Sequence, residues 1–235
     1  MEVKSIYPII NFSDEDEIAV QYERLGADGV IIISPDFSDE AMLIKKIRNI
    51  CEKSDCRLYI WQPYRRLEDI KKVLYAGAAG AWIEATEQTL IREAADRFGA
   101  DRVGMVISEP KLAADEFKLA KELNLTNIFV TGTIEKLPET VGDQKVIATC
   151  RYENKEGQKQ LLADINVSAI ALIYENETAA LPNIHAMKAG LETDSVKFNL
   201  FRSSLPFSAF KLNDDGLIPV IVQDFRTAEI LMMAY

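Results

Sequence analysis

The feature that most constrains this chain is a regular alternation of short apolar segments with amphipathic ones, repeated eight times over residues 5–191. Gly29–Ser34 is almost entirely valine and isoleucine, which indicates a strand buried on both faces. Ser38–Lys53 follows it and carries apolar residues at helical spacing. Alternating strands and helices predict parallel strands joined by crossover helices. Eight units predict a (β/α)₈ barrel, with a doubly wound open sheet as the alternative on periodicity alone.

The boundaries of the expected elements follow from this alternation. Strands are predicted at residues 5–12, 29–34, 57–61, 80–83, 102–108, 127–131, 145–150 and 169–174. Helices are predicted at residues 14–26, 38–53, 67–76, 86–98, 111–123, 134–139 (short), 156–165 and 181–191. We expect Ser13 to cap the first helix and Gly26 to end it. A doubly wound sheet needs a glycine-rich phosphate turn after its first strand, and Asn11–Asp14 contains no glycine, so the barrel is favoured.

The apolar period stops after residue 191, and a different organisation follows. Residues 193–209 mix charges with serine and proline and are predicted to be a linker, which places the barrel domain at residues 1–192. Within residues 210–235, the apolar runs Leu217–Val222 and Ile230–Tyr235 flank a polar turn, and this pattern predicts a β-hairpin. Because a lone hairpin is only marginally stable in water, we expect it to be the truncated start of a second domain.

Charge and cysteine content exclude several classes of function. The formal net charge of −10 at pH 7 opposes binding to nucleic acid and to anionic membranes. No apolar run is long enough to span a bilayer, and the charged N-terminus does not resemble a signal peptide. The cysteines, Cys51, Cys56 and Cys150, lack metal-binding spacing, so we expect reduced thiols and a cytoplasmic location. The single histidine, His185, is expected to pack at a helix end rather than to act in catalysis.

Four segments of the barrel region carry a family resemblance: Tyr22–Asp28, Arg65–Asp69, Val73–Gly80 and Glu93–Gly99. They resemble the cyclase subunit of imidazole glycerol phosphate synthase, a phosphate-binding barrel of histidine biosynthesis with a ribulose-phosphate-binding-like fold. The resemblance spans roughly residues 1–190 and is most specific up to Ser108. It implies a site at the C-terminal ends of the barrel strands.

Two later segments, Asn213–Asp224 and Glu229–Tyr235, resemble the opening of phosphoribosyl-AMP cyclohydrolase. That enzyme is a metal-dependent hydrolase of the same pathway and is often fused to phosphoribosyl-ATP diphosphatase. The resemblance implies a divalent metal, zinc or magnesium, in the missing hydrolase part, whereas we expect no cofactor and no metal ligand within residues 1–235. It also implies as partners the downstream cyclohydrolase domain or another histidine-pathway enzyme, with a homodimer formed through the missing domain. Asp214–Gly216 itself is interpreted as a turn.

The positions that would carry the cyclase chemistry are substituted. The family uses carboxylates after its first and fifth strands for acid–base work. The matching residues here are Asn11 and Ser108, whose side chains do not exchange a proton near pH 7. Ser34 stands where the family has an aspartate after the second strand. The resemblance therefore supplies no catalytic residue for this chain.

The phosphate-binding positions are substituted as well. Glycines let backbone N–H groups approach an anion closely, and the family places glycines or small residues after strands three, seven and eight. This chain has Trp61–Pro63, Thr149–Tyr152 and Tyr174–Glu177 there. Asn11, Trp61, Arg65 and Ser108 are kept as candidate ligand-binding residues at the mouth of the barrel.

We therefore interpret residues 1–192 as a non-catalytic barrel, fused to the cyclohydrolase as an interaction module. The alternative is an active or metabolite-binding cyclase-like barrel that works through Glu84, Glu109 or Glu175 near the strand ends. A binding-only role, such as sensing histidine or a nucleotide, lies between the two.

The mouth of the barrel discriminates between these hypotheses. Carboxylates converging on an open pocket lined by glycine would favour an enzyme. A mouth plugged by Trp61, Tyr64 and Tyr152 would favour the non-catalytic barrel. Packing inside the barrel is the expected role of Trp61 and Trp82.

Overall fold

The computed structural model describes residues 3–35, 39–108, 113–132, 136–174, 180–200, 205–224, 227 and 229–235. The chain forms two compact units, Met1–Leu200 and Phe201–Tyr235, which are described separately below.

The first unit is a closed barrel of eight parallel strands. Each strand pairs with the next along the chain, and β1 closes the ring by pairing with both β2 and β8. The strands are β1 (Val3–Asn11), β2 (Val30–Ile33), β3 (Leu58–Trp61), β4 (Gly80–Glu84), β5 (Val103–Ile107), β6 (Asn127–Val130), β7 (Val146–Arg151) and β8 (Val167–Ile173). The predicted barrel is confirmed, and closure rules out the open sheet, which would leave two edge strands unpaired.

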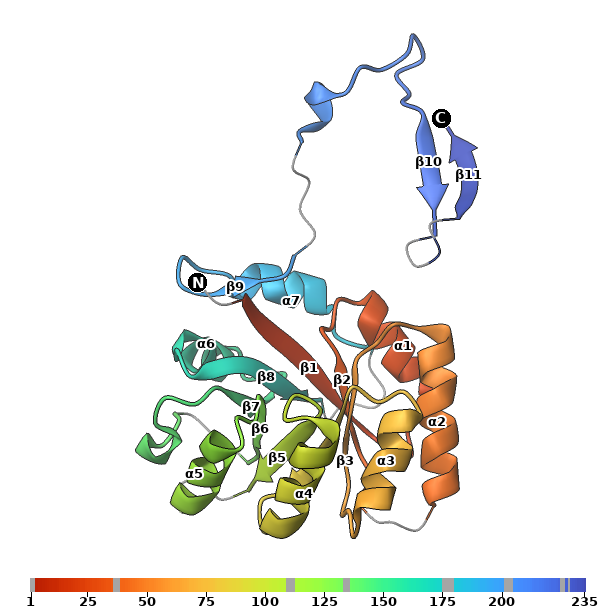
Figure 1. Ribbon diagram of the computed structural model, residues 1–235. Coiled ribbons are helices and arrows are strands. Elements are labelled where there is room, and N and C mark those ends of the chain that lie inside the picture. Colours follow the sequence, from red (N-terminus) through yellow and green to blue (C-terminus); the bar gives the residue numbers. More distant parts are fainter. Residues whose placement is uncertain are drawn as a thin grey trace. The chain divides into compact units, whose positions relative to one another are not determined.

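Helices lie outside the strands (Figure 1) and connect them in the order expected. They are α1 (Asp16–Arg24), α2 (Glu40–Lys53), α3 (Leu67–Tyr75), α4 (Gln88–Phe98), α5 (Ala114–Glu122), α6 (Lys155–Ala163) and α7 (Ile184–Leu191). Between β6 and β7 the described residues form a single 3₁₀ turn, Glu139–Val141, where a short helix was predicted at residues 134–139. Residues 134 and 135 of that prediction lie outside the described part of the chain.

The first helix begins later than predicted. The N-cap of α1 is Glu15, whose side chain makes no capping hydrogen bond, so the prediction that Ser13 caps this helix was wrong. The physical reason is a turn before the helix, in which the Asp14 N–H donates to the Asn11 carbonyl oxygen at 3.1 Å. Gly26 does end the helix, with φ at +98°, a conformation that glycine adopts without steric cost.

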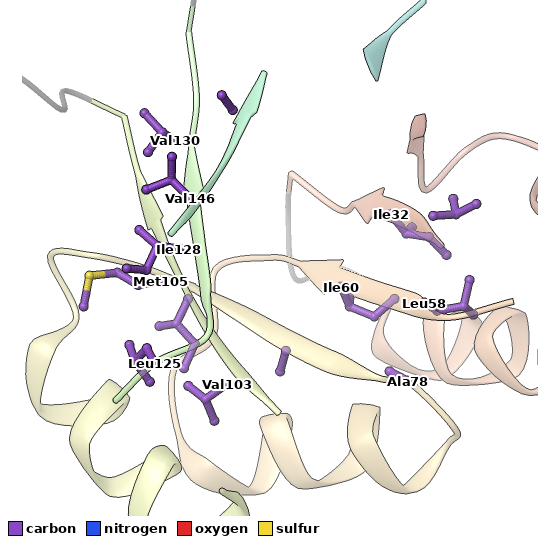
Figure 2. Close-up of a cluster of buried hydrophobic side chains, with 14 of the residues drawn as sticks. Ile32, Leu58, Ile60, Ala78, Val103, Met105, Leu125, Ile128, Val130 and Val146 are labelled. Atoms are coloured by element: carbon purple, nitrogen blue, oxygen red, sulfur yellow. The ribbon is translucent and has the colours of Figure 1, made fainter. Parts of the chain in front are cut away.

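The larger hydrophobic core fills the layer between the strands and the helices. Alternate strand residues, such as Ile32, Ile60, Met105 and Ile128, point outward into this layer (Figure 2) and are almost fully buried. The residues between them point into the barrel, because successive side chains of a strand face opposite sides. Both faces of each strand are therefore buried, one against the helices and one inside the barrel, which explains why the strand sequences are continuous apolar runs.

Part of the segment 193–209, predicted to be a linker, belongs to the barrel unit. Lys197–Phe198 form a short strand, β9, which pairs in parallel with Val3 and Lys4 at the start of β1. Val196 and Phe198 are buried in the outer core. Among the described residues, no helix has both the length and the apolar character needed to cross a bilayer.

The second unit contains an antiparallel hairpin, β10 (Val220–Gln223) and β11 (Ile230–Ala234), as the two apolar runs predicted. The turn expected at Asp214–Gly216 is present, with the Asn213 side chain accepting from the Leu217 N–H at 2.8 Å. Along β10, the consecutive residues Val220, Ile221 and Val222 are all exposed. Since these side chains alternate between the two faces, both faces of the hairpin present apolar groups to solvent.

Candidate functional site

The inside of the barrel is filled with side chains, most of them aromatic or branched. They form a second buried cluster, separate from the outer core: Tyr7, Ile31, Tyr59, Trp82, Val106, Phe129, Ile147, Ala169 and Ala171. Each comes from a different strand except the two alanines, which both come from β8. For the residues that the structure describes, the barrel interior is therefore a packed core rather than a channel.

Trp82 lies at the centre of this packing. Its side chain is fully buried, and its ring centroid lies 5.1 Å from that of Tyr59 and 4.8 Å from that of Phe129. The neighbouring strand makes room for the indole with Gly104, which pairs directly with Trp82 in the β4–β5 register. A Cβ atom at Gly104 would lie only 2.2 Å from Cδ1 of Trp82. The prediction that Trp82 packs inside the barrel is confirmed.

Trp61, a candidate ligand-binding residue, packs against this cluster at the C-terminal end of the strands. It is the last residue of β3, and its ring packs edge-on against Phe129 with centroids 5.6 Å apart. Its indole Nε1 donates a hydrogen bond of 2.7 Å to Oε1 of Glu84, the last residue of β4. Both side chains are half-buried. The one described carboxylate of the enzyme hypothesis is thus engaged by the aromatic plug.

Asn11 and Ser108 lie on the same rim of the barrel but on opposite sides of it. Asn11 is the last residue of β1, and Ser108 directly follows β5. In a ring of eight consecutive strands, the first and the fifth are diametrically opposed. Both residues are exposed, and the Asn11 backbone N–H donates to the Asp14 carboxylate at 2.7 Å. The two rim positions therefore carry side chains that do not exchange a proton near neutral pH.

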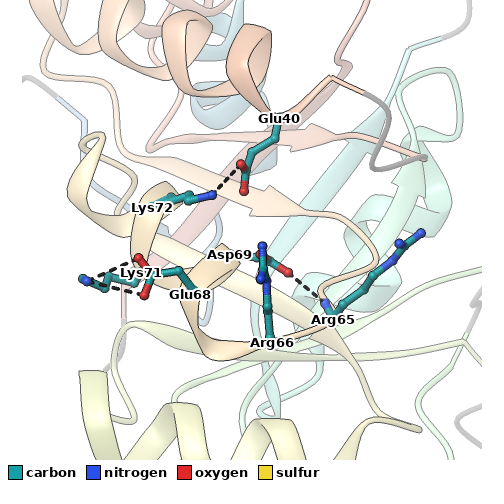
Figure 3. A network of polar contacts seen from close by, with 7 residues as sticks. All are labelled: Glu40, Arg65, Arg66, Glu68, Asp69, Lys71 and Lys72. Carbon is teal, nitrogen blue, oxygen red and sulfur yellow. Dashed lines mark hydrogen bonds and ion pairs between the residues drawn. The ribbon is translucent and has the colours of Figure 1, made fainter.

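Arg65 belongs to a charged network at the start of α3 (Figure 3), beside the mouth. Its backbone N–H donates to the carboxylate of Asp69 at 3.3 Å, and Nε of Arg66 donates to the same group at 2.9 Å. Asp69 is almost fully buried, so these hydrogen bonds satisfy a carboxylate that would otherwise be costly to bury. Lys72 pairs with Glu40 across the α2–α3 contact at 2.6 Å. The network holds the β3–α3 loop against the helix start.

The two tyrosines that were considered for an aromatic plug lie elsewhere. Tyr64 is buried in the outer core, where its hydroxyl donates to the Ile60 carbonyl oxygen at 3.1 Å. Tyr152 packs edge-on against Tyr174 and against the outer core. Glu109 and Glu175, two of the three carboxylates of the enzyme hypothesis, lie outside the described residues.

Titration behaviour in the barrel follows burial. The pKa of Tyr59 is raised above its ordinary value, mainly because burial disfavours the phenolate and also because Tyr7 lies beside it. Burial raises the pKa of the Cys56 thiol to about 12 and also raises the pKa values of Cys51 and Cys150. A thiol with a raised pKa is a poor nucleophile at neutral pH. None of the cysteines has the environment of a reactive thiol.

His185 and the described carboxylates form no metal site. Within the described part of the chain, no three residues of the His, Cys, Asp and Glu types gather in a way that could hold a metal ion. His185 lies in the first turn of α7, where its backbone N–H donates to the Leu25 carbonyl oxygen at 2.9 Å and its ring lies against Gly26. It packs at a helix end, as expected. No family model matches the chain.

Sequence reasoning missed how the aromatic plug is assembled. Phe129 was not singled out, although it contacts both Trp61 and Trp82. The available signal was the alternation itself, because residues two apart along one strand point to the same side of the sheet. The hydrogen bond between Trp61 and Glu84 joins residues at the ends of adjacent strands, and only the strand order and register bring them together.

Proposed function

We propose that residues 1–192 form a non-catalytic barrel of a histidine-biosynthesis polypeptide, fused to a phosphoribosyl-AMP cyclohydrolase segment that begins near residue 210. The barrel provides a folded interaction surface for its own downstream domain or for another enzyme of the pathway. The hydrolase part opens the purine ring of phosphoribosyl-AMP by hydrolysis.

The observation that carries this proposal is the aromatic packing at the mouth. A cyclase-like enzyme needs ionisable groups that face a substrate in a cavity. Here the interior is occupied by Trp82 and Phe129, and Trp61 covers them while it binds the Glu84 carboxylate at 2.7 Å. Asn11 and Ser108 offer no proton exchange at the two opposite positions of the rim.

The exposed hairpin supports the second half of the proposal. Ile221, Ile230, Leu231 and Met233 are each about 60% exposed, which is unusual for four neighbouring apolar residues. A two-stranded hairpin gains stability by packing against further strands or a helix. Residues 213–235 resemble the opening of the cyclohydrolase, in which this hairpin would be covered by the rest of that domain.

The metal expected for the cyclohydrolase does not fit the described residues. They contain no cluster of three or more potential ligands, and Asp214 and Asp215 lie in an exposed turn. We therefore assign no step of the hydrolysis to this part of the chain.

Incubation of the purified chain with the cyclase substrate tests the proposal. We expect no turnover above that of a buffer control. The variant Glu84→Gln serves as the matched control, because it removes the one described carboxylate among the three that the enzyme hypothesis names. Turnover by the wild type that disappears in Glu84→Gln would overturn the proposal in favour of the active barrel. Turnover that is equal in both proteins would overturn it as well, with catalysis through groups other than Glu84.

A further inference from the structure

A groove between α6 and α7 is the strongest unassigned feature of the barrel unit. It encloses about 380 Å³, and its lining includes Tyr152, Lys155, Lys159, Met187, Gly190 and Leu191. This volume falls in the range of small-molecule sites, roughly 300–1,000 Å³. The groove lies in the helical layer, outside the packed interior of the barrel, so it is independent of the proposed function.

The groove exists because two residues on one face of α7 have small side chains or none. Ala186 and Gly190 are four residues apart and therefore lie on the same side of the helix. A Cβ atom placed on Gly190 would meet no atom within 4 Å. Met187 and the buried Leu191 supply an apolar lining next to this hollow.

The opposite wall is polar and held in place. Gln158 is 1% exposed, and its Nε2 donates to the carbonyl oxygens of Arg151 and Tyr152 at 3.0 and 2.7 Å. Tyr152 packs edge-on against Tyr174, whose hydroxyl in turn donates to the Ala180 carbonyl oxygen at 3.2 Å. These contacts fix the β7–α6 loop, so this side of the groove is formed before any ligand arrives.

The charge of the groove is opposite to that of the whole protein. The chain carries a net charge of −10, yet the lining holds two lysines and no carboxylate. Lys155 and Lys159 are four residues apart on the same face of α6, and neither makes an ion pair with a described residue.

We propose that this groove binds a small molecule with a single anionic head, phosphate or carboxylate, and a compact apolar body. The head lies between the ammonium groups of Lys155 and Lys159. The body lies against Met187 and Leu191, in the space left by Gly190. An anionic head without an apolar body gains only the exposed charge contacts, which are weak.

Binding of two simple probes, phenyl phosphate and benzoate, tests the proposal by NMR titration of the whole chain at constant ionic strength. Benzyl alcohol is the neutral control. We expect saturable binding of at least one anion, with the two arms distinguishing a phosphate from a carboxylate preference, and no saturation by benzyl alcohol. Loss of one charge-assisted contact is expected to weaken binding about tenfold in Lys155→Ala or Lys159→Ala. Lys118→Ala removes an exposed lysine of α5 that lies outside the groove and should leave the affinity unchanged.

A second variant separates shape from charge. Gly190→Leu places a side chain in open space without a positive φ, so the fold is retained while the groove is filled. We expect it to abolish binding of both anions. Undiminished binding in Gly190→Leu, or no saturation by either anion up to about 10 mM, overturns the proposal. Binding of a glutamate-rich helical peptide but of neither small anion also overturns it, because the occupant would then be a protein segment. None of these results depends on turnover, so the binding proposal for the groove and the proposal of a non-catalytic barrel are tested separately.

Discussion

Replacing Gly104 by alanine tests whether the interior of the barrel is as closely packed as the structure indicates. The added Cβ atom would lie 2.2 Å from Cδ1 and 2.6 Å from Nε1 of Trp82. Non-bonded carbon atoms normally stay about 3.5–4.0 Å apart, so the indole or the strand has to move by more than about 1 Å. The indole has nowhere to go, since Tyr59 and Phe129 pack against it with ring centroids at 5.1 and 4.8 Å.

The expected cost lies at the upper end of the range for overpacking a core, about 3 kcal/mol of unfolding free energy. For a protein of this size each kcal/mol corresponds to about 2–4 °C, so the melting temperature should fall by about 6–12 °C. Urea denaturation and thermal unfolding followed by circular dichroism measure both quantities. Gly190→Ala is the matched control: its Cβ meets open space in a helix, and alanine is favoured over glycine there by about 0.8–1 kcal/mol.

A double-variant cycle identifies the partner of the added methyl group. Trp82→Leu should cost several kcal/mol by itself, because it leaves a cavity in a fully buried position. Combined with Gly104→Ala, the total cost should be smaller than the sum by about 1 kcal/mol or more, since the two residues are in contact. A cost of Gly104→Ala below about 0.5 kcal/mol, or strict additivity in the cycle, would refute the reasoning.

Three further outcomes follow from individual contacts. Lys188→Met removes a buried ammonium that lies 2.7 Å from Asp28, and it should lower the unfolding free energy by about 3 kcal/mol in urea, whereas a loss under about 1 kcal/mol would contradict a structural role for the pair. The thiol of Cys56, with a pKa of about 12, should react with Ellman's reagent far more slowly in the native protein than in urea, and its rate should rise about tenfold for each pH unit as the pH increases towards 12, because only the thiolate reacts; rapid labelling of the folded protein at pH 8 would show that the thiol is not buried. Trp61→Phe keeps the ring packing but loses the 2.7 Å hydrogen bond to Glu84, so stability should fall by about 1 kcal/mol in urea denaturation, and an increase would mean that this bond is not formed.

Local pattern was sufficient to place most elements of the barrel. The predicted strand at residues 80–83 is β4 (Gly80–Glu84), and the predicted helix at 67–76 is α3 (Leu67–Tyr75). These elements bury apolar residues at a regular spacing, which a single segment reveals without its neighbours. The first helix was less predictable, because Asn11 and Asp14 form a turn that displaced the expected cap at Ser13.

The sequence predicted where the candidate site residues lie, but not which side chains they contact. Asn11, Trp61 and Ser108 were expected at the strand ends and are found there. Their surroundings were not predictable, because the contacts at the mouth join strands that are adjacent in space but separated along the chain by a helix. Of the three aromatic residues considered for a plug, Tyr64 and Tyr152 pack in or against the outer core instead.

The amino-acid sequence by itself determined the number, order and parallel direction of the eight barrel strands, since these follow from the alternation of apolar and amphipathic segments. It also determined that the rim residues Asn11 and Ser108 do not titrate, because that is a property of the side chains. Only the tertiary structure decided that the ring closes through β1, that Trp82 is opposite Gly104, and that Trp61 binds Glu84. These facts depend on the register between strands, which is set by simultaneous packing of the whole barrel and leaves no mark in any one segment.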